Sequence, residues 1–282
     1  MTISIITTIT RPEERQDNWK EAIACYLDLA NEVVVVYGDK GDKELLDRHF
    51  SDYRNIKFVY VPWPYEWNWI ELPRHLNAGL AECNSDWVMR CDIDFFISKE
   101  MFWMLKEQLG RVPDNIDVLS ISKFNAIYGG RYLMKGSIPI VFRNGVGIGF
   151  GEILGEDTDL CYPVRVKSHR VVGEDYMLPV GDRPGTMRSG VQFWNYGYFF
   201  KTKDFTRKEF FRMSRAWNRF FGNWEFGNTE RGAFKYFMNM ERERYDMAKP
   251  CSLEMHPECI REAVSKLTPE QFGYDGWGLL KE

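Results

Sequence analysis

The chain has 282 residues, which is enough for one large or two small domains with a buried core. Of these residues 44% are hydrophobic and 28% are charged, which is ordinary for a globular protein. The formal net charge of −4 argues against a general nucleic-acid binder but leaves room for a local basic surface. The six cysteines form no CxxC pair, which indicates free thiols, and the four histidines are too scattered for a zinc cage. The sequence shows no signal peptide and no apolar run long enough to cross a bilayer, so we expect a cytoplasmic protein.

Strand and helix patterns alternate over the first half of the chain. Short β-branched or apolar runs predict strands, and apolar residues at helical spacing predict the helices between them. The expected strands cover residues 3–8, 32–37, 56–61, 86–91 and 118–122, and the expected helices cover 19–30 (capped by Asp17), 43–50, 70–81 and 99–109. This order predicts an α/β fold in which a Rossmann-like, mostly parallel sheet is flanked by helices.

The second half of the chain lacks this alternation. Residues 123–201 look irregular and are rich in Gly, Asn and aromatic residues, and such stretches are usually functional or mobile. The aromatic content of 16% indicates an aromatic-lined cleft or, equally, aromatic packing in this half. Helical patterns return at residues 204–221, 228–247 and 257–266. We expect one compact domain with an N-terminal nucleotide-binding half, residues 1–125, and a C-terminal half, residues 126–282, for a second substrate.

Two acidic residues, Asp92 and Asp94, close the fourth expected strand. Side chains two residues apart in an extended segment point the same way, and open α/β sheets bind ligands at the carboxyl ends of their strands. Two close carboxylates repel each other unless a cation or a proton lies between them, and Mg²⁺ binds one or two carboxylates together with substrate phosphates. The pair therefore predicts a divalent-metal site, with an ordinary acidic strand-to-helix turn as the alternative.

The order of these segments resembles the GT-A glycosyltransferases, family 2 in particular. The resemblance covers roughly residues 1–125, through the strand at 32–36, the sequence LNAGLAE at 76–82 and the strand that ends in Asp92-Ile93-Asp94. It continues in GEDTDL at 155–160, similar to a later Glu-Asp motif on the acceptor side, and in FWNYGY at 193–198, similar to an aromatic-His-Tyr-Gly segment. The resemblance implies a GT-A fold with a helical acceptor-side region at the C-terminus.

The resemblance also implies a nucleotide-sugar donor, UDP- or GDP-linked, and a Mn²⁺ or Mg²⁺ ion. Asp94, helped by Asp92, would hold the ion across the donor's diphosphate, and Asp92 could instead contact the ribose or a metal-bound water. The implied nucleotide contacts are Thr8, Thr10, Arg11, Asp39 and Asn77. Arg11 either contacts a phosphate or lies in a solvated turn. The family usually has an Asp at the position of Tyr37, so the resemblance assigns the nucleobase contact to Asp39 instead.

Family 2 members invert the sugar, so one carboxylate must take the proton of the acceptor hydroxyl. Asp157, beside Glu156, is the first candidate for this base and Asp175 the second. The alternative is structural: residues 156–158 have the composition of a helix N-cap. Asn195 stands where some relatives carry His, which weakens a metal or phosphate contact at that position.

Three further features have both a functional and a structural interpretation. The sequence GVGIGFG at 145–151 predicts a lid over the donor or a plain loop, and it lacks the Lys-Ser/Thr of a phosphate loop. His256 is a metal ligand or a helix-entry residue before Pro257. The basic, aromatic region 201–244 contacts diphosphate, an anionic membrane surface or nucleic acid, or is the solvated face of an amphipathic helix.

We therefore expect a metal-dependent, inverting hexosyl- or pentosyltransferase that acts on a glycan, lipid-linked or cell-envelope acceptor. One alternative is sugar transfer to a modified nucleic-acid base, as in viral DNA modification, with the basic helix as the track. A nucleic-acid partner is not favoured. Another alternative is a non-catalytic module that binds nucleotide sugars. A peripheral contact with a membrane surface is a further alternative.

Overall fold

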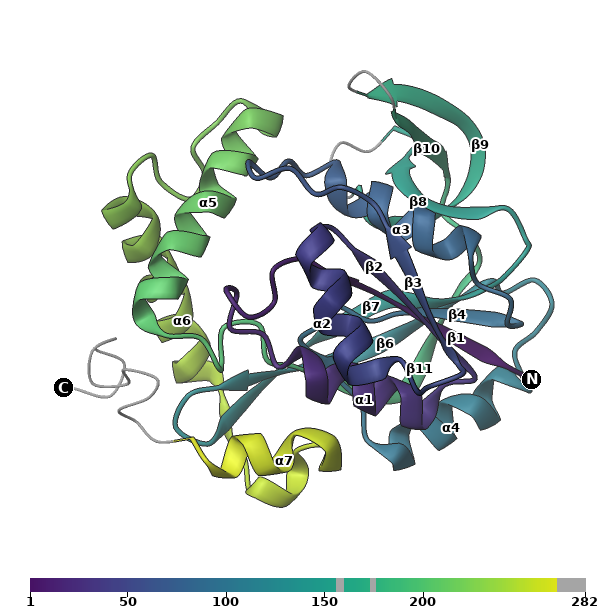
Figure 1. Ribbon diagram of the computed structural model, residues 1–282, viewed down its shortest axis with the longest axis horizontal. Helices are drawn as coiled ribbons and strands as arrows, with labels where there is room; N and C mark the ends of the chain where they lie inside the picture. The colour runs from purple at the N-terminus through teal and green to yellow at the C-terminus, as the bar shows by residue number, and fades with distance from the viewer. Residues whose placement is uncertain (156–159, 173–175, 268–282) are drawn as a thin grey trace.

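The computed structural model describes residues 1–155, 160–172 and 176–267, and a mixed sheet forms its centre (Figure 1). The first four strands in space are parallel and lie in the order β3-β2-β1-β4. Their bounds are Ile56–Tyr60 for β3, Glu32–Tyr37 for β2, Ile3–Ile9 for β1 and Trp87–Arg90 for β4. The chain moves outward from β1 to β3 and then returns to place β4 on the other side of β1, so the strand order reverses between β1 and β4.

The sheet continues beyond β4 with mixed pairing. β7 (Arg131–Arg143) runs antiparallel between β4 and β6 (Val118–Ile127), and β11 (Thr186–Asn195) lies parallel to β6. Two short strands complete it: β5 (Phe95–Phe96) pairs with β11, and β12 (Lys249–Pro250) pairs with β7. The predicted α/β class, with a large sheet flanked by helices, is confirmed.

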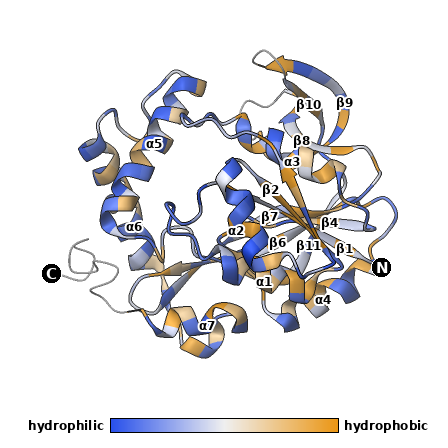
Figure 2. Cartoon of the chain, in the orientation of Figure 1, coloured by the Kyte–Doolittle hydropathy of each residue, from blue (hydrophilic) through white to orange (hydrophobic). Residues whose placement is uncertain are grey.

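Helices cover both faces of the parallel strands. The valines of β2 alternate between two clusters: Val33 and Val35 pack with the helices α1, α2 and α4, whereas Val34 and Val36 pack with α3. The helices are α1 (Trp19–Leu29), α2 (Lys40–Phe50), α3 (Glu71–Ala81) and α4 (Lys99–Leu109). Burial on both faces explains why the four central residues of β2 are valines, whereas α5 and α6 mix hydrophobic and hydrophilic residues in Figure 2.

The expectation of an irregular stretch over residues 123–201 is wrong. It holds the second half of β6, all of β7 and β11, and three further strands, β8 (Ile148–Ile153), β9 (Tyr162–Val172) and β10 (Tyr176–Asp182), which close on one another. The lid interpretation of the glycine-rich sequence is also wrong, because its second half is strand β8. A Cβ on Gly151 would lie 1.9 Å from the carbonyl oxygen of Pro179, so glycine is required by the close pairing of β8 and β10.

The C-terminal helices lie against the sheet core. α5 (Lys203–Phe221) and α6 (Glu230–Met247) pack through Phe210 and Phe237, whose ring centroids are 5.1 Å apart. A short helical turn, η1 (Leu253–Met255), precedes α7 (Glu258–Ser265), which contacts α1. All six cysteines are free thiols, as predicted. Within the described ranges, no helix is both long enough and apolar enough to span a bilayer.

Gly79 lies on the face of α3 that packs closely against the sheet. A Cβ at this position would lie 2.7 Å from Val36 Cγ2 and 2.8 Å from Ile6 Cγ2, both in the strands beneath. We expect Gly79→Ala to lower the free energy of unfolding by about 1–3 kcal/mol in urea denaturation, because overpacking outweighs the better helix propensity of alanine.

Gly110→Ala is the matched control for this substitution. Gly110 ends α4 with φ −67°, and its added Cβ would meet no atom closer than 3.5 Å. It should leave stability unchanged or slightly raised. Equal stability of the two variants would mean that α3 does not press on the sheet as described.

Candidate functional site

A cavity of about 250 Å³ lies where the strand order reverses between β1 and β4. Open α/β sheets bind their ligands at such a reversal, outside the carboxyl ends of the strands. Residues from five parts of the chain line it: the end of β1, the segment before α1, the segment from β3 into α3, the turn after β4, and the chain leading into and along α5. The cavity therefore joins residues from both halves of the sequence.

Asp92 and Asp94 both line this cavity. The extended geometry predicted for them is wrong, because β4 ends at Arg90 and the residues after it turn, with the Phe95 N–H donating to the Asp92 carbonyl over 2.8 Å. The turn, and not strand alternation, brings the two carboxylates to one cavity.

The two carboxylates have different surroundings. Arg90 donates to both carboxylate oxygens of Asp92, from Nε to Oδ1 and from Nη2 to Oδ2, each over 3.0 Å. Asp94 is half-buried, and its burial, followed by the charge of Asp92, raises its pKa to about 6, although Lys201 opposes this shift. Asp94 is thus the carboxylate whose negative charge is least compensated by the protein.

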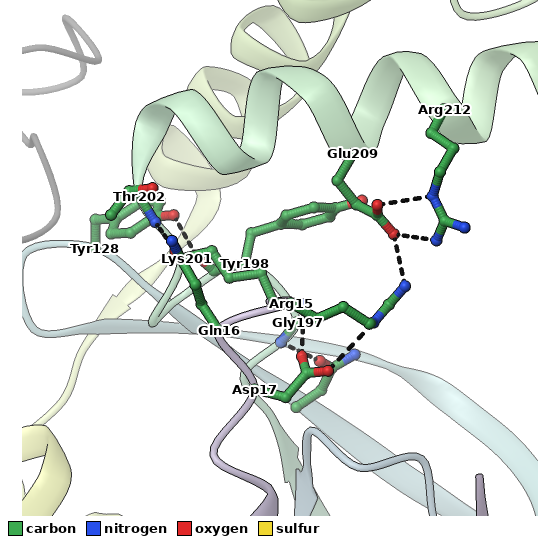
Figure 3. A network of polar contacts seen from close by, with 11 residues as sticks. Arg15, Gln16, Asp17, Tyr128, Gly197, Tyr198, Lys201, Thr202, Glu209 and Arg212 are labelled. Carbon is green, nitrogen blue, oxygen red and sulfur yellow. Dashed lines mark hydrogen bonds and ion pairs between the residues drawn. The ribbon is translucent and has the colours of Figure 1, made fainter. Parts of the chain in front are cut away.

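A largely buried ion-pair network, drawn in Figure 3, contributes a further part of the cavity wall. Asp17 accepts from Lys201 Nζ over 2.7 Å and from Arg15 Nε over 3.3 Å. Arg15 Nη1 also reaches Glu209 Oε1 over 3.0 Å, and Arg212 donates to Glu209 through Nε over 2.9 Å and Nη2 over 2.7 Å. The prediction that Asp17 caps α1 is wrong: Asn18 occupies the cap position without a side-chain hydrogen bond, and Asp17 is used in this network.

Sequence reasoning missed most of this network. The sequence alone did not single out Arg15, and it placed Lys201 and Arg212 only within the basic, aromatic region 201–244. Only the partners, Asp17 and Glu209, distinguish these cations from solvated ones, and no local pattern links residues nearly two hundred positions apart. The spacing of residues along the sequence could therefore not have identified these ion pairs.

The predicted nucleotide contacts divide into two groups. Thr8 and Thr10 line the cavity, whereas Arg11, Asp39 and Asn77 do not. The backbone N–H of Arg11 donates to the Asp42 carboxylate and its guanidinium lies over the Tyr65 ring, 5.2 Å from the centroid.

Asp39 and Asn77 make structural bonds. Asp39 is exposed and caps α2 by accepting from the Gly41 N–H over 2.9 Å. The Asn77 amide bonds both the N–H and the carbonyl of Phe150, which fastens α3 to β8. The arrangement does not bring either side chain to the cavity.

Other candidates from the sequence lie elsewhere. Glu156, Asp157 and Asp175 fall outside the described residues. Asn195 accepts from the Gly197 N–H over 2.7 Å and is not part of the cavity wall.

His256 is buried, and both of its ring nitrogens have partners. Nδ1 lies 2.7 Å from the Tyr196 hydroxyl and Nε2 lies 3.4 Å from Cys251 Sγ. Burial lowers the pKa of His256 to about 4. The helix-entry interpretation of this residue fits better than the metal-ligand one.

The donor set of the cavity suits a hard divalent cation that arrives with a phosphate ligand. No three His, Cys, Asp or Glu side chains converge as a metal cage in the part of the chain that the structure describes. Asp94, next to Asp92, offers the one or two carboxylates with which Mg²⁺ is usually bound when substrate phosphates supply further ligands. Burial and the charge of Asp92 raise the pKa of Asp94, and a bound cation would oppose both effects.

The sequence matches no protein-family model and no curated protein. Among solved structures, TarS residues 1–349 from S. aureus in complex with UDP has a TM-score of 0.45 at 14% identity, over 87% of this chain and 72% of that chain. Glucosyl-3-phosphoglycerate synthase from Mycobacterium tuberculosis, with Mn²⁺, UDP and glucosyl-3-phosphoglycerate, has a TM-score of 0.29 at 17% identity, over 46% and 45% of the two chains.

A third similar structure is 4-diphosphocytidyl-2C-methyl-D-erythritolsynthase from Anaerococcus prevotii DSM 20548. Its TM-score is 0.35 at 17% identity, over 51% of this chain and 70% of that chain. Similarities at this level assign neither a family nor an activity, so the functional conclusion must come from the cavity itself.

Glu209 provides a pH test of the ion-pair network. Burial alone would raise its pKa, but Arg15 and Arg212 lower it to about 2. A lowered carboxyl pKa stabilises the fold above the ordinary pKa of glutamate, and this contribution is lost as the pH falls from about 4.5 towards 2. We expect Glu209→Gln to lower the free energy of unfolding at pH 7 by on the order of 2 kcal/mol, with a smaller difference at pH 3.

The exposed Glu262, paired with Lys266 on α7, is the control position. Glu262→Gln should change stability little at either pH, as is usual for surface pairs. A Glu209→Gln variant whose stability matches the native protein at pH 7 would contradict the network's role.

Proposed function

We propose that the protein is a metal-dependent glycosyltransferase that binds a nucleotide-sugar donor in the cavity between β1 and β4. The observation that carries this proposal is a cavity at the reversal of the strand order whose wall contains Asp92 and Asp94 together with the cations Arg15 and Lys201. This arrangement suits a ligand that is itself a diphosphate with a bound cation. The GT-A resemblance of the sequence supports the same conclusion.

Charge balance supports a metal ion in the complex. Three cations and four carboxylates line the cavity, and Arg90 adds a fourth cation through its pair with Asp92. The protein charges therefore cancel before the donor binds, and the negative charges of a diphosphate would be uncompensated. Asp94, with Asp92, would hold Mn²⁺ or Mg²⁺, which stabilises negative charge on the departing diphosphate when bound.

The chain's own residues have the following roles in this proposal. Thr8 and Thr10, at the end of β1, bind the nucleoside side of the donor. Lys201 and Arg15 contact the diphosphate and partly exchange their bonds to Asp17 for bonds to phosphate oxygens.

The proposed acceptor chemistry rests on the sequence resemblance. We propose that direct displacement inverts the configuration of the sugar. Asp157, with Glu156 beside it, is the base that takes the proton of the acceptor hydroxyl, and Asp175 is the second candidate. Most of the donor site belongs to residues 1–125 and the acceptor side to residues 126–282, while Lys201 and α5 reach across to the donor. The acceptor is a glycan, a lipid-linked sugar or a cell-envelope hydroxyl.

Asp94→Asn tests the proposal directly. A neutral amide removes the charge that would hold the cation, so we expect the Mn²⁺-dependent hydrolysis of a UDP- or GDP-sugar, without acceptor, to fall by roughly 10²–10³-fold. Asp92→Asn should cost less, because Arg90 already takes both of its oxygens. The measurement is release of UDP or GDP from a panel of nucleotide sugars.

Asp114→Asn, at an exposed position outside the cavity, is the control and should retain full turnover. If the native protein hydrolyses none of the donors but still binds one, the non-catalytic module becomes the better description. Full turnover by Asp94→Asn would contradict the assigned role of this carboxylate.

A further inference from the structure

A second cavity, of about 260 Å³, adjoins the first. Leu72 lines both cavities, and the Arg90–Asp92 ion pair lies between them, with Arg90 in the wall of the second and Asp92 in the wall of the first. The second cavity lies on the β7 side of β4, against the strand residues Ile138 and Ile140. Two adjoining cavities are what a transfer reaction between two substrates requires.

Given the proposed function, on which this inference rests, we propose that the second cavity binds the acceptor as an uncharged pyranose ring. The acceptor oxygen forms a bond to the anomeric carbon of the donor sugar, and the bond from that carbon to the diphosphate oxygen breaks. The bonding electrons leave with the nucleoside diphosphate, and the hydroxyl proton passes to the carboxylate base.

The walls of the second cavity suit an uncharged ring. Among the described residues that line it, Arg90 alone is charged, and its guanidinium is already bonded to both oxygens of Asp92. The remaining lining is apolar or aromatic and includes Trp69, Trp217 and Phe221. A phosphorylated or otherwise anionic acceptor would have no unpaired cation there, whereas a neutral ring would lose little on leaving water.

Two tryptophans form a corner that matches the shape of a pyranose. The rings of Trp69 and Trp217 are 5.7 Å apart at 86°, and the indole N–H of Trp217 donates to Asn223 Oδ1 over 2.9 Å, which fixes its orientation. A pyranose has a face of C–H groups that stacks on one indole, while its edge meets the other.

The wall of the second cavity also contains a hydrogen-bond donor without a partner. The indole N–H of Trp69 is buried and has no hydrogen-bond partner in the described part of the chain. A buried donor of this kind is stabilised when an acceptor oxygen, such as that of a sugar hydroxyl, reaches it.

Three basic residues of α5 near the cavities are already paired with acidic side chains. Arg215 and Arg219 on α5 both pair with Glu66, at 3.4 Å and 2.8 Å, and Arg212 pairs with Glu209. A polyanion bound along this face would have to break these pairs. The structure thus favours a neutral sugar over a modified nucleic-acid base as acceptor.

The test measures binding of methyl glycosides by saturation-transfer difference NMR in the presence of UDP and Mn²⁺. The panel holds the methyl α- and β-pyranosides of glucose, galactose, mannose and N-acetylglucosamine. We expect saturable binding of at least one glycoside to the native protein. Trp217→Leu and Trp69→Leu should each weaken that binding at least tenfold. Trp103→Leu, at a 68% exposed tryptophan on α4, is the control and should bind as the native protein does.

Calorimetric titration of UDP with Mn²⁺ separates this inference from the proposed function. If UDP does not bind the native protein, the proposed function fails, and the glycoside titrations still decide the second cavity. The inference is overturned if no glycoside binds, or if both tryptophan variants bind glycoside as the native protein does. It is also overturned if UDP binding falls in parallel with glycoside binding, since the cavity would then belong to the nucleotide, or if a short DNA duplex binds and the glycosides do not.

Discussion

The carboxylate of Asp94 lies in a cavity wall where burial and a second carboxylate both disfavour its negative charge. Lys201 opposes this effect only in part, because it is ion-paired with Asp17, and Arg212 and Arg90 are likewise paired with Glu209 and Asp92. A site with balanced internal charge and one poorly compensated carboxylate gains from a cation that enters with an anionic ligand. This electrostatic constraint connects the fold to the proposed chemistry.

The same network also connects the two halves of the chain. Arg15 and Asp17 follow β1, whereas Lys201 immediately precedes α5 and Glu209 lies in α5, so their ion pairs hold α5 over the cavity. Buried pairs of this kind lose much of their stabilisation when one partner is removed. The donor cavity is therefore as dependent on the C-terminal helices as on the parallel strands, and the second cavity shares α5 as a wall.

Local patterns predicted the parallel strands and the helices α1 to α4 well, because Val33 to Val36 are apolar on both faces and Ser98 supplies cap chemistry before α4. They failed between residues 123 and 201, where β8 and β10 pair through glycines that carry no apolar period. At the site, Asp92 and Asp94 were found because they are neighbours in sequence. Arg15, Lys201 and Trp217 were not assigned to it, since their roles depend on partners distant along the chain.

Anomalous diffraction from crystals grown with Mn²⁺ and UDP or GDP would test the central claim most directly. The account predicts a single strong manganese peak in the cavity between β1 and β4, within coordination distance of the Asp94 carboxylate and of the nucleotide's phosphate oxygens. A bound nucleotide with no manganese peak, or a peak away from Asp94, would contradict it.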